Sequence, residues 1–276
     1  MARASLAAEQ IEVRPAVCDV ADAAAVDALV ASVEEQDGPI SVAVLVAGVI
    51  QVGPLASLDR SHFREAINIM LWGPINLALA VAGPMRARGS GRIGVITSIG
   101  GLVPVPHLLP YSTAKFGAVG FTAGLRNELA GTGVKVTTVA PGLMRTGSHL
   151  RAEFTGNQAA EYAWFAPSAS LPVLAMKPEK AAAKIVDGIL AGRAYVLLSL
   201  LTKVASRLNG LAPATTSALL GLAARLLPAG SPAQSASTSQ GYQVEGRLKA
   251  VPAAALKVVT LFGRSSARRL NQHPPR

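Results

Sequence analysis

The chain has 276 residues, of which half are hydrophobic, and a formal net charge of +10 at pH 7. This length and composition predict a globular protein with either one large α/β domain or two small ones. The single cysteine, Cys18, excludes an internal disulfide framework and is compatible with a reducing cytoplasm, where we expect the protein to act.

The positive charge lies mainly in the second half of the sequence. Residues 1–144 carry 10 Lys and Arg against 11 Asp and Glu, whereas residues 145–276 carry 16 against 5. Such a basic region can contact an anionic membrane or a nucleic acid, but a solvated basic tail is the commoner explanation. We expect no nucleic-acid partner. The apolar runs 38–58 and 208–224 are interrupted by Gly, Pro or polar residues, so neither is interpreted as a transmembrane span.

In chain order, strand and helix patterns alternate through the first half of the sequence. "VRPAVCDV" is interpreted as a short strand ending near Asp19, helical spacing follows up to Gly38, and the apolar run "ISVAVLVAG" predicts a buried strand. The next segments predict a helix from about Ser61 to Ala87, a strand "GRIGVITSI", a helix from about Tyr111 to Ala130, and a strand "VKVTTVAPG". This alternation predicts an α/β fold with a doubly wound parallel sheet of the Rossmann type.

The periodicity changes after Gly147. "KPEKAAAKIVDGILAG" predicts a helix with Pro178 near its start, "AYVLLSL" a last strand, and "LLTKVASRLNGL" and "PATTSALLGLAARLLP" two amphipathic helices. We therefore predict one Rossmann-like domain over residues 1–230, with a helical C-terminal extension at 196–230. The small, polar residues that follow predict a flexible basic tail over 231–276.

Two interpretations of the Leu-rich residues 200–227 remain open. With Lys203, Arg207 and Arg225 beside many Leu, this segment can rest peripherally on a membrane surface and admit a lipophilic substrate. Alternatively, it covers the substrate cleft or an oligomer interface, which is the commoner role of apolar helix faces.

The stretch "PYSTAK" contains the residue pair with the most direct link to chemistry. Tyr111 and Lys115 are four residues apart near the start of a predicted helix, so both side chains emerge on one face. An ammonium close to a phenol favours the phenolate, which brings a tyrosine pKa of about 10 nearer to neutral pH, where a general acid or base works. The pair is a weak indication by itself, because Tyr and Lys at this spacing are common on solvated helices.

Further polar residues lie in a defined order around this pair. Ser98 ends the strand "GRIGVITS", where open α/β sheets place ligand-contacting residues. Asn68 lies inside the helix "REAINIMLWGPINLA", where an amide is a poor helix former. Each residue has an ordinary structural explanation in isolation, such as a turn cap or an exposed side chain. Their order and spacing taken together indicate a functional site far more specifically than any one of these residues does.

The order Asn68, Ser98, "YSTAK" and "PGLMRT" resembles the short-chain dehydrogenases/reductases over roughly residues 8–195. The resemblance implies an oxidoreductase that moves a hydride between NAD or NADP and a small-molecule carbonyl/alcohol substrate. It implies that Tyr111 is the general acid/base, that Lys115 lowers its pKa and holds the nicotinamide ribose, and that Ser98 stabilises the substrate oxygen. Because members of this family are usually dimers or tetramers, we expect a homo-oligomer.

The other site residues are implied by the resemblance alone. Asn68 would hold its helix and a water that links Lys115 to solvent. Asp19 matches the acid that contacts adenine, although it can also begin a helix as an N-cap. The full set implied to bind the cofactor is Asp19, Ala47, Gly48, Tyr111, Lys115, Pro141, Gly142 and Thr146.

The sequence departs from the family pattern in two places. The phosphate-binding glycine turn TGxxxGxG is missing, and alignment on the other motifs predicts an N-terminally truncated fold without the first two strands. A misplaced start or a fragment would explain this. Leu45 and Val46 also replace a pair of asparagines before Ala47. The competing hypothesis is therefore a catalytically inactive fragment or a non-enzymatic binding protein.

The four histidines, His62, His107, His149 and His273, show no metal-ligand spacing with Cys18 or one another. We therefore expect no metal and interpret them as surface or loop residues. His107 lies close before Tyr111 and is a candidate for lining the substrate entrance.

Overall fold

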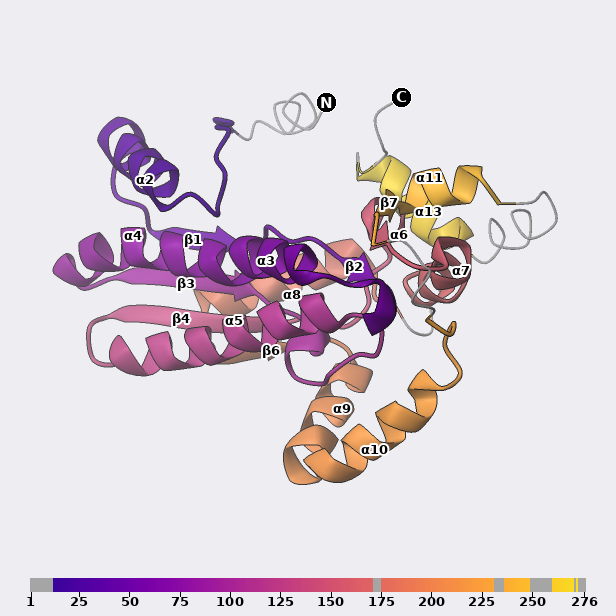
Figure 1. Cartoon of the computed structure of the whole chain (residues 1–276). Helices are drawn as coiled ribbons and strands as arrows, with labels where there is room; N and C mark the ends of the chain where they lie inside the picture. Colours follow the sequence, from indigo (N-terminus) through magenta and orange to yellow (C-terminus); the bar gives the residue numbers. More distant parts are fainter. Residues whose placement is uncertain (1–11, 171–174, 231–235, 249–259, 271, 273–276) are drawn as a thin grey trace.

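The computed structural model describes residues 12–170, 175–230, 236–248, 260–270 and 272 (Figure 1). Its largest sheet has four strands in the order β1-β3-β4-β6, and every neighbouring pair is parallel. The strands are β1 (Val42–Leu45), β3 (Gly91–Ile96), β4 (Val134–Ala140) and β6 (Tyr195–Leu197). The predicted parallel sheet is therefore confirmed.

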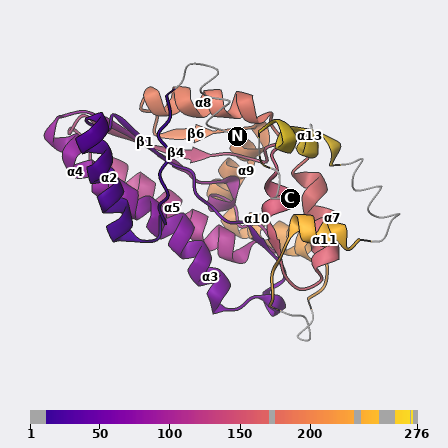
Figure 2. The same ribbon diagram turned by 90° about the horizontal axis from the view of Figure 1, so that it is seen from above.

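Helices cover both faces of this sheet, as the view from above shows (Figure 2). α4 (Gly73–Ala87) and α5 (Leu109–Glu128) pack on one face, and α8 (Pro178–Leu190) packs on the other. α2 (Ala23–Asp37) lies beside α4, past the β1 edge of the sheet (Figure 1). This three-layer arrangement is the doubly wound, Rossmann-like architecture predicted from the alternating pattern.

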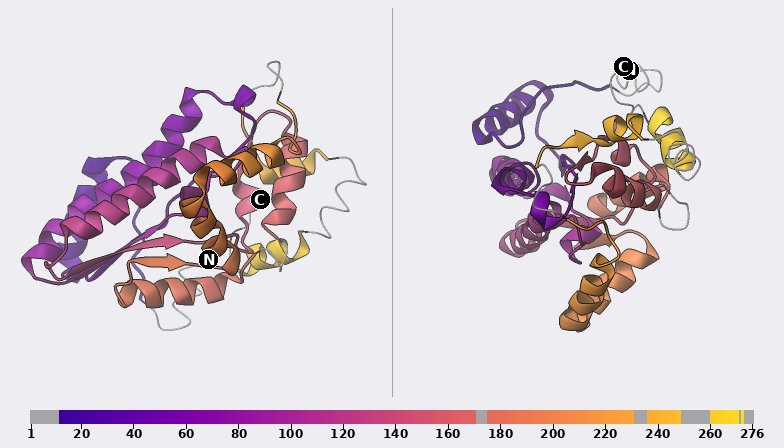
Figure 3. Two further views of the ribbon diagram at one scale, coloured as in Figure 1. Left: turned by 90° about the horizontal axis from the view of Figure 1, so that it is seen from below. Right: turned by 45° about the vertical axis from the view of Figure 1, so that its right-hand side comes forward.

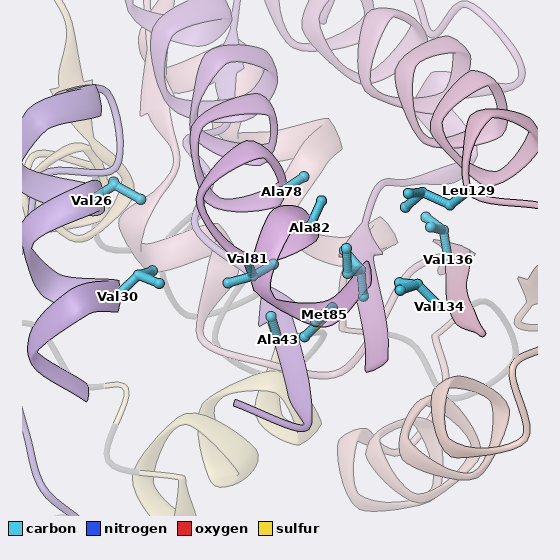
Figure 4. Close-up of a cluster of buried hydrophobic side chains, with 11 residues drawn as sticks. Val26, Val30, Ala43, Ala78, Val81, Ala82, Met85, Leu129, Val134 and Val136 are labelled. Atoms are coloured by element: carbon cyan, nitrogen blue, oxygen red, sulfur yellow. The ribbon is translucent and has the colours of Figure 1, made fainter. Parts of the chain in front are cut away.

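A buried apolar cluster fastens α2 and α4 to the sheet (Figure 4). Val26 and Val30 of α2 point toward α4, whose Val81 and Met85 are fully buried. A Cβ atom on Gly91, at the start of β3, would lie only 2.4 Å from the Met85 sulfur, so the absent side chain gives Met85 its space. Burying side chains of this size contributes about 1.5–3 kcal/mol each, which fixes α4 on the sheet.

The helix predicted from about Ser61 to Ala87 is interrupted in the middle. α3 (Arg60–Ile67) leads into the π-helical turn η2 (Asn68–Trp72), where the Gly73 amide donates to the Asn68 carbonyl five residues back, and α4 follows. The whole run is long and apolar enough to cross a membrane by length and composition alone, yet its Met70 and Met85 are buried inside the protein. π-turns of this kind often mark functional positions, and this one begins at Asn68.

The strand predicted from "VRPAVCDV" is wrong. Residues 13–19 have no strand structure, and Val17 is fully exposed. Arg14 instead forms an ion pair with Asp37 at the end of α2, at 3.0 Å. A strand needs a neighbouring strand to pair with, and none of the described residues supplies one here. β1 is consequently an edge of the sheet as described, and its Val44 is exposed.

A second, small sheet brings together residues from distant parts of the chain. β2 (Gln51–Val52) pairs in parallel with β5 (Glu153–Phe154), and β5 pairs antiparallel with β7 (Ser239–Gln240). Around it lie the 3-10 turn η1 (Leu55–Ser57) and four helices, namely α6 (Ser148–Arg151), α7 (Gln158–Ser168), α11 (Gly241–Gly246) and α13 (Leu261–Arg269).

The described residues of the segment 231–276, which the sequence predicts as a flexible tail, include a strand and two helices. Val244 of α11 is buried in a cluster with Phe154 and Tyr162, and Ala267 of α13 is also buried. The apolar side chains spaced through this basic segment therefore pack against the domain, a contribution that a composition-based prediction misses.

The two helices predicted within residues 200–228 are present as α9 (Leu200–Leu211) and α10 (Pro213–Ala224). α9 is amphipathic as predicted, whereas the apolar residues of α10 lie all around the helix, so its predicted amphipathic pattern is wrong. They form a hairpin that projects from the body of the molecule, as Figure 1 and the right view of Figure 3 both show. α10 contains no buried residue.

Candidate active site

Several of the expected site residues lie at one edge of the large sheet. Ala47 and Gly48 follow β1, Ser98 follows β3, and Pro141 follows β4. Because these strands are parallel neighbours, their carboxyl ends meet at the same edge. This edge is where open α/β sheets bind ligands.

Lys115 is fixed by the strand next to its helix. Its ammonium donates a hydrogen bond of 2.8 Å to the carbonyl of Ile96, the last residue of β3, and lies 5.9 Å from the centre of the Tyr111 ring. The side chain is only 5% exposed. Burial lowers the pKa of Lys115 to about 8, so the ammonium can release a proton near neutral pH more readily than an ordinary lysine.

Tyr111 has a pKa shifted in the direction opposite to the sequence-based expectation. Burial raises the pKa of the phenol, and a hydrogen bond with the Ser98 side chain lowers it by less. Desolvation disfavours the phenolate more than the hydrogen bond stabilises it. Tyr111 is therefore a protonated phenol in this structure.

Ser98 is positioned by a tight turn that packs on α5. Its backbone is extended, with φ at −167°, and its hydroxyl oxygen accepts a hydrogen bond of 3.1 Å from the Gly100 amide at the turn η3 (Ile99–Gly101). A Cβ atom on Gly100 would lie 3.0 Å from the Tyr111 ring. Ser98 thus both caps the turn and contacts Tyr111.

Gly101 sets the distance between this turn and the helix that carries Lys115. A Cβ atom at Gly101 would lie 2.5 Å from the Lys115 carbonyl oxygen, whereas one at Gly124, in the same helix α5, would meet nothing within 4 Å. We expect Gly101→Ala to lower the free energy of unfolding by about 1–3 kcal/mol, because the turn must move away. Gly124→Ala is expected to raise it by about 0.5–1 kcal/mol. Urea unfolding of both variants measures this difference, and equal effects would contradict the close approach.

Gly48 lies next to the Lys115 ammonium and the Met70 side chain. A Cβ atom at Gly48 would lie 3.8 Å from Lys115 Nζ and 3.4 Å from the Met70 sulfur. An added Cβ atom would thus make ordinary van der Waals contact with both side chains. Gly48 and Lys115 are therefore adjacent in the structure.

Only the first part of the turn after β4 lies next to the Ser98 turn. The Pro141 carbonyl accepts a hydrogen bond of 2.8 Å from the Ile99 amide, which joins this turn to the Ser98 turn. Gly142 lies against α9, since a Cβ there would be 2.7 Å from Thr202 Oγ1. Thr146 lies elsewhere, on the wall of an open pocket of about 390 Å³ with Arg151.

Asp19 and Asn68 line a different open pocket, of about 340 Å³, together with Ser61, Arg64 and Glu65. The Asp19 carboxylate accepts a hydrogen bond of 2.9 Å from the Ala21 amide, which caps a turn. The N-cap of α2 is Asp22, not Asp19. The structure thus brings Ser98, Tyr111, Lys115 and Gly48 together. Asp19 and Asn68 line one pocket, and Thr146 lines another.

Sequence reasoning missed a buried polar cluster next to Tyr111. Glu161 is fully buried, its carboxylate oxygens lie 2.9 and 3.0 Å from His107 Nδ1, and it accepts a hydrogen bond of 2.7 Å from the Trp164 indole. His107 is held in the left-handed region, with φ at 61°, and its carbonyl accepts from the Gly53 amide at 2.8 Å. No local signal could reveal this contact, because His107 and Glu161 are 54 residues apart.

Two of the other histidines are not at the surface. His62 is 5% exposed and His149 is fully buried, so the interpretation of both as surface or loop residues is wrong. His62 completes the N-terminal capping box of α3 with Asp59, and burial lowers the pKa of His149 to about 4, which keeps it neutral. Among the described residues, no three His, Cys, Asp or Glu side chains gather as a metal-binding group.

Comparison with known proteins agrees with this geometry. The family model described as short chain dehydrogenase matches residues 1–154, more than half of the chain. The chain belongs to the short-chain dehydrogenase family. This short-chain dehydrogenase is 41% identical to a Streptomyces coelicolor protein described as a ketoacyl reductase, over 138 residues that make up 49% of this chain and 53% of the relative. It is 33% identical over 190 residues to SadH of Mycobacterium tuberculosis, described as an oxidoreductase, with 67% of each chain covered.

A solved structure supports the same fold. The crystal structure of a short-chain dehydrogenase from Streptomyces avermitilis matches with a TM-score of 0.65 and 27% sequence identity, covering 80% of this chain and 83% of that one. This short-chain dehydrogenase spans about half the length of several curated relatives that it matches. Its fold and family are therefore established, and its activity is a matter for proposal.

Proposed function

We propose that the protein is an oxidoreductase that transfers a hydride between NAD or NADP and a small-molecule carbonyl/alcohol substrate. The contact of Ser98, Tyr111 and Lys115 at the carboxyl edge of the parallel sheet carries this proposal. The relatives support it, since two of them are described as a ketoacyl reductase and an oxidoreductase.

In the proposed reaction, the side chains of this chain hold the substrate oxygen and move its proton. The Ser98 and Tyr111 hydroxyl groups would both donate to the substrate oxygen and stabilise the charge that develops there. Tyr111 would give its proton to that oxygen in reduction, and its raised pKa keeps this proton on the phenol before the reaction. Lys115 would stabilise the phenolate left behind. Asn68 would hold a water that links Lys115 to solvent.

The described residues fit one end of a nicotinamide dinucleotide better than the other. Lys115 would hold the nicotinamide ribose beside Gly48, where an added Cβ atom would lie 3.8 Å from the ammonium. When bound, the dinucleotide would supply or accept the hydride. In the part of the chain that the structure describes, no glycine-rich turn leads from a strand into a helix N-terminus beside β1. The remaining contacts in this proposal come from Asp19, Ala47, Tyr111, Pro141, Gly142 and Thr146.

A non-catalytic binding protein is the second candidate. It is favoured by the missing glycine turn among the described residues and by the separation of Asp19 and Thr146 from the Tyr111 site. For either candidate, we propose a homo-oligomer that acts in the cytoplasm.

Calorimetric titration with NADH and NADPH separates the two candidates. We expect saturable binding of at least one dinucleotide, at one site per chain. In a separate assay, we expect the protein to oxidise the reduced dinucleotide when members of a panel of ketones are added. Lys115→Met should weaken binding at least tenfold, whereas Lys135→Met, an exposed lysine on β4, should not. A protein that melts cooperatively yet binds neither dinucleotide would overturn the enzyme proposal and leave the binding protein.

A further inference from the structure

The hairpin of α9 and α10 presents an apolar surface that the proposed chemistry does not use. The inner side of α9 is fixed by Thr202, which is fully buried, and by Asn209, whose amide donates to the Leu102 carbonyl at 2.9 Å. Successive residues turn by about 100° around a helix, so the opposite side carries a different stripe. That stripe is apolar and is 45–85% exposed, and it consists of Leu200, Val204, Leu208 and Leu211.

α10 continues this surface. It contains no charged residue and no buried one, and Leu219, Leu222 and the following Leu226 are 63%, 60% and 87% exposed. α9 and α10 contact each other, and the hairpin stands away from the sheet in Figure 3. Exposed large apolar side chains gathered on two adjoining helices differ from the singly scattered ones that are normal on a soluble protein, so the hairpin marks a binding surface.

The charge of the segment has one sign only. From Gly188 to Val244 the sequence contains no Asp or Glu. On the hairpin, Lys203, Arg207 and Arg225 are exposed, and their side chains have no ion pair or hydrogen bond within the part of the chain that the structure describes. Lys203 and Arg207 border the leucine stripe of α9 along one side, by helix geometry. Apolar side chains bordered by unpaired cations complement an anionic lipid surface.

We propose that the α9–α10 hairpin docks on an anionic phospholipid bilayer. The leucines would enter the boundary between acyl chains and headgroups, and the three basic side chains would contact the headgroup phosphates. A second copy of this chain is a poorer occupant, because pairing two such surfaces would bring like charges together. Each basic residue near an anionic surface contributes about fivefold in affinity.

In the docked state, α9 would stand between the lipid and the residues next to the proposed active site. Asn209 of α9 bonds to Leu102, which directly follows the Ser98 turn, and Thr202 packs against Gly142. If the proposed oxidoreductase function holds, docking would bring the enzyme to a bilayer in which a lipophilic ketone or alcohol substrate dissolves. This consequence rests on the proposed function, whereas the docking itself does not.

Co-sedimentation with vesicles tests the docking without any turnover. The full chain is mixed with phosphatidylcholine vesicles, with or without phosphatidylglycerol, at low and high salt. We expect sedimentation with the anionic vesicles that weakens as salt rises. Leu211→Ser combined with Leu226→Ser should lower the affinity at least tenfold. Leu55→Ser combined with Leu79→Ser is the control, because these two leucines lie outside the hairpin and are 69% and 65% exposed. This variant should keep the wild-type affinity for the vesicles.

Three results would overturn the proposal. They are no sedimentation with anionic vesicles, equal sedimentation of the hairpin variant and the wild type, or equal binding to neutral and anionic vesicles. A dimer that the hairpin variant dissociates, seen by analytical ultracentrifugation without vesicle binding, would assign the surface to a second copy instead. Because dinucleotide binding is measured separately, failure of the docking leaves the proposed enzyme function untouched, and the reverse also holds.

Discussion

Tyr111→Phe is expected to lower turnover by about a thousandfold, because it removes the only proton that the proposed mechanism delivers to the substrate oxygen. The ring is kept, so its packing against Ala66 and Met70 is unchanged. Ser98 keeps its hydrogen bond from the Gly100 amide. The free energy of unfolding should therefore change by no more than about 1 kcal/mol.

Steady-state rates with the reduced dinucleotide, together with urea unfolding, measure both quantities. Tyr195→Phe is the matched control, because Tyr195 lies on β6 and is 45% exposed. A Tyr111→Phe enzyme with turnover within tenfold of the wild type would remove Tyr111 from the role of acid.

Lys115→Met is expected to abolish measurable turnover and, unlike most losses of a buried side chain, to leave the protein at least as stable at pH 7. A pKa lowered from 10.5 to about 8 means that the buried ammonium costs about 3 kcal/mol at neutral pH. Methionine has a similar length and no charge. It leaves the Ile96 carbonyl without its donor, which costs about 1–3 kcal/mol and offsets part of the gain.

The pH dependence distinguishes this explanation from simple packing. Between pH 8 and 10.5 the unfolded wild type still binds the Lys115 proton and the native protein does not, so wild-type stability rises with pH in this window. The variant lacks this contribution. We therefore expect the wild type to gain about 3 kcal/mol relative to Lys115→Met between pH 7 and pH 10.5, measured by urea unfolding. Lys135→Met, at an exposed site, should show no such trend, and a pH-independent difference for Lys115→Met would refute the lowered pKa.

The large sheet and its helices could be predicted because the hydrophobic residues of each strand or helix follow the spacing typical of that element. β3, α5 and β4 are long, regular segments, and their ends fall close to the predicted ones. The strand over 13–20 was wrong because a strand depends on a neighbour that local pattern does not contain. The π-turn at Asn68 leaves no sequence signal either, since one extra residue per turn hardly alters the apolar spacing.

The contact of Ser98, Tyr111 and Lys115 could be predicted from the sequence, whereas the pKa shift of Tyr111 and the neighbouring His107–Glu161 contact could not. Tyr111 and Lys115 share a helix, so their proximity follows from spacing alone. Ser98 meets them because strand ends of a parallel sheet converge. The direction of the Tyr111 pKa shift depends on how deeply the ring is buried, which only the packed structure gives. His107 and Glu161 meet through the fold, and a single sequence holds no record of that contact.

The small sheet of β2, β5 and β7 also bears on the order of folding. Its strands contribute two residues each, and they come from near residues 51, 153 and 239. Forming so few hydrogen bonds across two long chain closures has a high entropic cost and little immediate gain. This sheet should therefore assemble last and open first, while the large sheet stays intact. The amides of Val52 and Phe154 would then exchange with solvent faster than those of β3 and β4, despite full burial of both side chains.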